Sequence, residues 1–203
     1  MAKRHYRGTI QAQISELTRQ RLFDVTLALY QEKPFDAVTL NEIAEGAGVT
    51  VQTVLRHFRS KEGLLSAIGT SFGEKVTQQR EEAPIGNIAG ALNNLIDHYE
   101  TVGLISLRSL SLEGRFLQID EFIKSGQEFH HRWVERVFAP FIARSKEGER
   151  GRLIAQLVTL CDVYTWKLLR LDAGLTREQT ELAMYEMLIA LFEKKNLLSE
   201  RET

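Results

Sequence analysis

The chain has 203 residues, 43% of them hydrophobic, which is enough for one packed domain or two small ones, and its formal net charge is −1. The single cysteine, Cys161, excludes an intramolecular disulfide. There is no secretory signal pattern and no apolar run of about 18 residues, so we expect a cytoplasmic protein that does not enter a membrane.

The pattern of apolar residues predicts an all-α fold. They recur at spacings of three and four along most of the chain, which is the period of amphipathic helices. The sequence has only three prolines and no Asn-Gly or Asp-Gly turn between alternating runs, so it lacks the usual signals of β-hairpins.

Residues 1–8 contain Lys3, Arg4 and Arg7 before any clear periodicity begins. They are either a basic arm that reaches a DNA minor groove or a solvated terminus, and the sequence leaves both open. A helix is expected from about 10 to 31, ending before Pro34, because the residue that precedes a proline avoids the α region. Its apolar stripe begins at Ile14 and Leu17.

The segment 39–62 predicts two short helices joined by a tight turn and followed at once by a third. Thr39 and Glu42 form a capping box at the start of the first helix, and Gly48 stands where a left-handed residue ends it. Thr50 can cap the second helix and Ser60 the third.

On the second of these helices, Val51, Val54 and Phe58 share one face, which we expect to point inward. The residues left for the outer face all form hydrogen bonds: Gln52, Thr53, Arg56 and His57. A steep helix pair of this kind projects its second helix into a DNA major groove, so the segment indicates a helix-turn-helix.

These residues carry a resemblance to a known family. The order T-L-x-E-I-A-x-x-A-G-V-T followed by T-V-L-x-H-F-x-S-K-E-x-L-L resembles the DNA-binding domain of the TetR family of transcriptional regulators, over 19–68. The chain departs from the family pattern at Pro34, where glycine is usual, at Gln52, where glycine is common, and at Leu55, where a tyrosine usually contacts a phosphate. That contact must then come from His57, Thr53 or Lys61, or be absent.

We expect the DNA contacts to divide into two kinds. Gln52, Thr53, Arg56 and His57 are candidates for base and phosphate contacts, since Arg suits guanine and Gln suits adenine. Thr39, Thr50 and Lys61 lie at helix starts, where backbone amides attract phosphates, although the two threonines can equally be structural caps. Residues 1–70 carry nine Lys and Arg against seven Asp and Glu, a small excess of the sign that DNA binding needs.

The remaining elements form a second domain. The third helix of the motif should run from Lys61 to about Arg80, which gives a DNA-binding domain of 9–80 and a C-terminal domain of 81–203. Helices are expected near 87–101, 102–113, 120–145 with a kink at Pro140, 150–172 and 176–196, the last with a capping box of Thr176 and Gln179.

The last two predicted helices have more apolar surface than one face can bury. The economical explanation is a four-helix interface between two copies, although one larger core within the subunit is the alternative. The family resemblance implies the same homodimer. The candidate interface residues are Leu157, Tyr164, Leu168, Met184, Met187, Leu188 and Leu191.

The resemblance also implies a small-molecule effector pocket in the second domain. Polar tips among aromatic rings suit such a site. The candidates are His98, Tyr99, Arg108, Phe129, His130 and Trp133, although each can instead be an ordinary core or surface residue.

No enzyme chemistry is predicted. Glu128 and His131 have the spacing of a carboxylate-bridged metal site, but the second copy of the motif is missing, and we expect neither a metal nor another cofactor. The sequence has no arguable catalytic triad and no glycine-rich phosphate loop.

The sequence therefore predicts a dimeric, ligand-responsive regulator, most simply a repressor that binds a palindromic operator in double-stranded DNA and is released by a small-molecule effector. Two alternatives stay open. One is a helical ligand-binding or enzymatic protein whose helix-turn-helix is only scaffold, and the other is a DNA-binding architectural protein that senses nothing.

Overall fold

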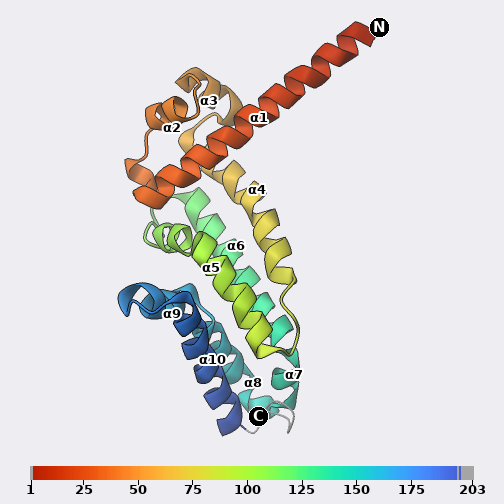
Figure 1. Ribbon diagram of the computed structural model, residues 1–203, viewed down its shortest axis with the longest axis vertical. Coiled ribbons are helices and arrows are strands. Elements are labelled where there is room, and N and C mark those ends of the chain that lie inside the picture. Colours follow the sequence, from red (N-terminus) through yellow and green to blue (C-terminus); the bar gives the residue numbers. More distant parts are fainter. Residues whose placement is uncertain (1, 196, 198–203) are drawn as a thin grey trace. The chain divides into compact units, whose positions relative to one another are not determined.

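The computed structural model describes residues 2–195 and 197, without the side chains of residues 2–10, 72 and 118. Every regular element in these residues is helical, so the all-α prediction is confirmed (Figure 1). The chain divides into two compact units, Met1–Phe72 and Gly73–Thr203. This division falls inside one helix, and the predicted domain boundary after residue 80 stays a prediction.

The first unit contains α1 (Ala2–Glu32), a short 3-10 turn η1 (Phe35–Ala37), α2 (Leu40–Gly46), α3 (Val51–Phe58) and the start of α4 (Lys61–Glu81). The backbone of α1 is helical from Ala2, whereas we expected no regular structure before about residue 10; the basic side chains of the predicted arm lie outside the described residues. As predicted, α1 ends before Pro34.

The core of the first unit begins at Leu22, not at the start of the predicted stripe. Ile14 and Leu17 are 57% and 66% exposed, so the first two residues of that stripe do not pack into the core. The core residues come from the second half of α1, from the residue that follows η1, and from α2, α3 and α4 with their ends: Leu22, Phe23, Val38, Ile43, Ala44, Ala47, Val54, Phe58, Leu64 and Ile68.

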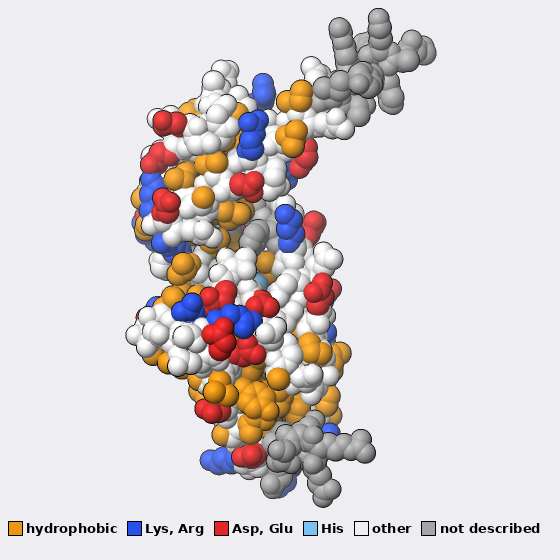
Figure 2. Space-filling model, viewed as in Figure 1, with side chains coloured by type: hydrophobic (Ala, Val, Ile, Leu, Met, Phe, Trp, Pro, Cys, Tyr) orange, Lys and Arg blue, Asp and Glu red, His pale blue; other side chains and the backbone are white. Residues whose placement is uncertain are grey.

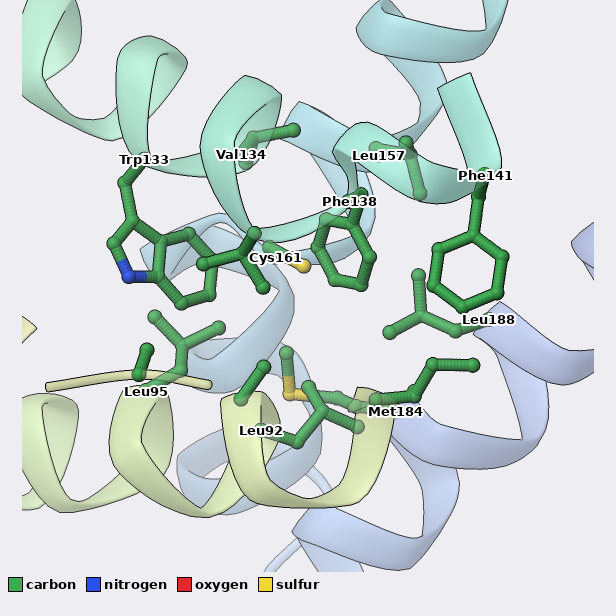
Figure 3. Packing of buried hydrophobic residues seen from close by; sticks show 14 of the residues in the cluster. Leu92, Leu95, Trp133, Val134, Phe138, Phe141, Leu157, Cys161, Met184 and Leu188 are labelled. Carbon is green, nitrogen blue, oxygen red and sulfur yellow. The ribbon is translucent and has the colours of Figure 1, made fainter. Parts of the chain in front are cut away.

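The second unit is a helical bundle. It contains the end of α4, then α5 (Ile88–Leu110), α6 (Leu117–Val137), α7 (Ala139–Arg144), α8 (Glu147–Leu160), α9 (Val163–Lys167), a π-helical turn η2 (Leu168–Asp172) and α10 (Arg177–Lys194). Its core is formed by side chains that converge from α5, α6, α7, α8 and α10 (Figure 3). Among them, Phe141 on α7 stacks on Phe192 of α10 with ring centroids 4.4 Å apart.

Three boundaries differ from the sequence prediction. The two helices expected over 87–113 are one helix, α5. The helix expected over 120–145 begins earlier, at Leu117, and breaks at Phe138, where Pro140 starts α7. The helix expected over 150–172 ends at Leu160, because Asp162 caps a new helix by accepting a hydrogen bond from the Tyr164 amide at 2.8 Å. The capping box of Thr176 and Gln179 is present as predicted.

Candidate functional site

The predicted helix-turn-helix forms from the local signals that the sequence contains. Thr39 accepts a hydrogen bond from the Glu42 amide at 3.2 Å, and the Glu42 carboxylate accepts from the Thr39 amide at 2.9 Å, so the capping box closes. Lys33 also pairs with Glu42, and this hydrogen bond, followed by those from Thr39, lowers the pKa of the Glu42 carboxyl to about 2. The start of α2 is thereby held at neutral pH.

The turn between α2 and α3 needs its glycine. Gly48 has φ +66°, in the left-handed region that side chains disfavour. Thr50 then caps α3 by accepting from the Thr53 amide at 3.2 Å. Val54 and Phe58 are buried, and Val51 packs against the same core, so the inward face of α3 is the predicted one.

The outward face of α3 is polar. Gln52 and Arg56 are exposed, while Thr53 and His57 are partly exposed. Thr53 shares a hydrogen bond of 3.0 Å with the Thr50 hydroxyl, so both threonines already act in the N-cap. Gln52 and Arg56 are therefore the two side chains of this helix with the most freedom to reach a base edge.

Lys61 is held within the first unit. Its ammonium donates to the Phe35 carbonyl at 2.9 Å and to the Val38 carbonyl at 2.8 Å, and it lies 4.5 Å from the Phe35 ring centroid. An ammonium has three donors, so one remains for a phosphate. Leu55, where the family usually has tyrosine, is 38% exposed and lines a shallow concavity of about 450 Å³ together with Thr39 and Lys61.

The join between α3 and α4 is tight. Arg59 has φ +66°, and Ser60 caps α4 by accepting from the Gly63 amide at 3.0 Å. A Cβ atom at Gly63 would lie 2.2 Å from the Phe58 carbonyl oxygen, so this position admits only glycine without a backbone shift. Sequence analysis did not identify Gly63, although its place three residues after a capping serine is a local signal.

In the second unit, four of the six predicted effector residues gather around a residue that the sequence analysis missed. This is Arg80, in the last turn of α4, with 2% of its surface exposed. Its guanidinium lies 4.0 Å from the Trp133 ring centroid and hydrogen-bonds Tyr99.

His98 and His130 complete the group. Burial, followed by the positive charge of Arg80, lowers the pKa of His98 to about 3 and that of His130 to about 4, so both rings are neutral at pH 7. Arg108 lies in the last turn of α5 and Phe129 lies on α6, and the side chains of both are partly buried.

The predicted interface residues fall into three groups. Leu157, Met184 and Leu188 have no exposed surface and belong to the core of the subunit, which removes them from any contact with a second copy. Met187 and Leu191 pack partly against the same core. Tyr164 and Leu168 are 51% and 59% exposed, and Leu182 on α10 is 56% exposed. Figure 2 shows hydrophobic side chains gathered over the part of this unit where α10 lies.

The metal spacing does not assemble a site. Glu128 pairs with Arg132 and His131 with Glu135, all on the exposed face of α6. Across the residues that the structure describes, no three His, Cys, Asp or Glu side chains lie close enough to hold a metal ion. In the same residues, no helix is long and apolar enough to cross a membrane.

Comparison with known proteins yields a family model described as "Bacterial regulatory proteins, tetR family", which matches residues 22–68. The chain is 31% identical over 90 residues to the transcriptional regulator AcrR of Shigella flexneri, covering 42% of this chain and 41% of that protein. Over 171 residues it is 24% identical to the transcriptional repressor KstR of Rhodococcus jostii, covering 82% and 80%. The match to three curated relatives, AcrR among them, covers only 27% to 41% of the length of each relative.

Among solved structures, a tetR-family transcriptional regulator from Streptomyces coelicolor matches with a TM-score of 0.68 and 18% identity, over 92% of this chain and 85% of that one. This match shows that the fold extends through both units. These relatives are described as transcriptional regulators rather than enzymes, which agrees with the absence of predicted enzyme chemistry.

Proposed function

Because the chain belongs to the TetR family of bacterial regulatory proteins, we propose that it is a transcriptional regulator that binds double-stranded DNA through α3, and that it acts as a repressor. The observation that carries the proposal is the polar outer face of α3, where Gln52 and Arg56 are exposed beside a capped helix start. Arginine and glutamine are suited to bidentate hydrogen bonds with guanine and adenine in the major groove. Such a protein acts in the cytoplasm, where the bacterial chromosome lies.

The second part of the proposal is a homodimer. Tyr164, Leu168 and Leu182 leave more than half of their surfaces exposed. Surface of this kind supports burial against a second copy of the same face, related by a twofold axis. Two copies of α3 then read the halves of a palindromic operator, with the half-site spacing set by their separation.

The third part is release by a small-molecule effector. An effector that binds one pose of the two reading helices more tightly than another shifts the dimer toward that pose, by the difference between its two affinities. α4 supports this mechanism, since it is a single helix that starts in the first unit and ends in the second.

The test is selection of the purified protein against a randomised duplex pool near physiological salt, followed by sequencing. We expect an enriched palindrome, and a steep loss of affinity with rising salt, because phosphate contacts release counterions. Arg56→Ala should weaken operator binding by about tenfold or more, as loss of one bidentate base contact costs roughly 1–3 kcal/mol. Arg150→Ala, which changes a surface arginine on α8, is the matched control and should bind normally.

Two results contradict the proposal. If the pool shows no enrichment and binding does not depend on salt, the protein is the ligand-binding or enzymatic alternative. If an operator is found but Arg56→Ala binds it unchanged, that residue does not belong to the interface.

A further inference from the structure

Arg80 carries a buried charge with an open hydrogen-bonding edge. Its side chain is almost fully buried, and among the described residues its Nε and Nη2 atoms have no hydrogen-bond partner. Two further contacts hold its backbone: Trp133 Nε1 donates to the Arg80 carbonyl at 2.9 Å, and Arg136 Nη2 donates to the same oxygen at 3.0 Å.

The groups around the guanidinium do not balance its charge. Tyr99 and Cys161 are neutral at pH 7, because burial raises the pKa of both, that of Cys161 to about 12. Arg136 is positive and opposes the charge of Arg80, whose own pKa burial lowers. Asp162 acts on Tyr99 and Cys161, but its carboxylate serves as the N-cap of α9.

An isolated buried charge is costly. The effective penalty for burying one ion in a protein is several kcal/mol, even after relaxation. The Trp133 ring offsets only part of it, since a desolvated cation–π contact contributes about 2 kcal/mol. A guanidinium stays protonated in proteins, so it cannot avoid this cost by losing its proton.

The two unpartnered atoms form one edge of the guanidinium. Nε–H and one Nη2–H point in parallel, with the spacing of the two oxygens of a carboxylate, which is the bidentate arrangement that arginine favours. With two parallel donors, the free edge selects a planar oxyanion such as a carboxylate more specifically than a point charge such as an ammonium group does.

The surroundings indicate what the anion is attached to. His130 Nε2 lies 3.3 Å from the Val158 carbonyl, which can only accept, so this nitrogen carries the proton and the buried, unpartnered Nδ1 is an acceptor. The neighbouring side chains are aromatic: Trp133 stacks on His130 and Trp166 lies against Tyr99. A ligand body with little charge suits these rings, and a highly charged one does not.

We propose that Arg80 is the anchor for a small organic acid, whose carboxylate binds bidentately to Nε and Nη2 while its apolar body lies among Tyr99, Trp133 and His130. This assignment rests on the proposed function, since it names the chemical class of the effector. Arg80 is 2% exposed, so the side chains that cover it must move to admit the acid.

The test is calorimetric titration of the full-length protein with benzoate, octanoate and indole-3-acetate, and with their neutral amides. The variants are Arg80→Met, which keeps the apolar stem without the charge, and Arg152→Met as a matched control, at an exposed arginine of α8. We expect at least one acid to bind both wild type and Arg152→Met, its amide to bind neither, and Arg80→Met to lose at least tenfold in affinity.

The proposal is overturned if no acid binds wild type, if acid and amide bind alike, or if Arg80→Met binds the acid as wild type does. Inorganic phosphate forms a separate arm, and binding of phosphate without any carboxylate would overturn the ligand class. Circular dichroism and thermal unfolding of Arg80→Met establish that the variant is folded, so lost binding is not lost structure.

Failure of this inference differs from failure of the proposed function. Arg80→Met should select the same operator as wild type, because α3 is untouched, and only its response to the acid should disappear. If the protein selects an operator but binds none of the acids, only the inference about Arg80 is refuted. Absence of any operator removes the proposed function.

Discussion

Acidification should destabilise the second unit well above the pH at which carboxylates titrate, because of His98 and His130. An unfolded histidine has a pKa near 6.5, whereas burial lowers the pKa of these rings to about 3 and about 4 in the folded state. Below pH 6.5 the unfolded chain therefore binds protons that the folded chain does not. Stability is fully present above pH 6.5 and falls as the pH drops toward 4.

The size of the effect follows from these values. At pH 5 the unfolded rings are almost fully protonated and the folded rings are almost wholly neutral. Linkage then gives a loss of about 2 kcal/mol per histidine between pH 7.5 and pH 5, or roughly 4 kcal/mol for the pair. Asp162, whose pKa burial raises above its ordinary value, acts in the opposite direction, and the pKa of Glu42 lies at about 2, below this pH range.

The assay is urea unfolding at fixed chain concentration, followed by tryptophan fluorescence. Both tryptophans, Trp133 and Trp166, lie in the second unit, so the signal reports its unfolding. A loss of roughly 4 kcal/mol lowers the urea midpoint by about 2 M for a unit of this size. The double variant His98→Gln/His130→Gln should lose most of this pH dependence, because glutamine does not titrate.

The control is His131→Gln, which changes the sequence neighbour of His130, with a side chain that is 52% exposed. It should keep the wild-type dependence on pH. A wild-type midpoint that is constant between pH 7.5 and pH 5, or a double variant with the wild-type slope, would refute the assignment of the two rings as buried and neutral.

Three other changes have definite expected outcomes. Arg80→Met should raise the free energy of unfolding by about 1–3 kcal/mol in the same urea titration. The reason is that it removes an unbalanced buried charge while the backbone contacts of residue 80 remain. A destabilised variant would show that neighbouring groups balance the charge of the guanidinium. Gly63→Ala should lower the free energy of unfolding by about 2 kcal/mol or more, because the new Cβ atom meets the Phe58 carbonyl. Gly73→Ala, in open space on the same helix, should raise it by roughly 0.5–1 kcal/mol. Equal thermal shifts of the two variants would contradict this. Leu168→Glu should weaken dimerisation at least tenfold in sedimentation equilibrium with Leu117→Glu as the exposed control, and an unchanged dimer would exclude this face.

Short-range patterns predicted the helix-turn-helix and missed the second unit's organisation, for one physical reason. The capping boxes at Thr39 and Thr176 each use residues three apart, so the chain needs no distant contact to form them. The cap of α9 is also local, because Asp162 accepts from the amide of Tyr164 two residues further on, and the sequence analysis overlooked it. At the same break, however, the Cys161 carbonyl accepts from Tyr99, 62 residues away. No local pattern contains that pairing.

The dimer residues illustrate a second limit. Periodicity identified two apolar stripes on the last helices but could not assign either to the core or to the surface, because both positions select the same residue types. Met184 and Leu188 belong to the core, while Leu168 is mostly exposed on the π-helical turn that replaces the predicted straight helix. The turn rotates the side chains that follow it, which a fixed helical period does not anticipate.

Each end of α4 is held by hydrogen bonds, and this bears on the proposed regulation. At its start, Lys61 is bonded to carbonyls of the first unit; near its end, Gln79 Nε2 donates to the Asn94 carbonyl at 2.8 Å, and Asn94 Nδ2 donates back to the Gln79 carbonyl. Arg80 follows immediately, so an acid bound to its free edge acts on a helix end that is already fixed to α5. In the proposed mechanism, a change at that end is passed along α4 to Lys61, the residue that follows the DNA-reading motif. The proposed regulation therefore needs no long chain of coupled side chains, because one helix belongs to both units.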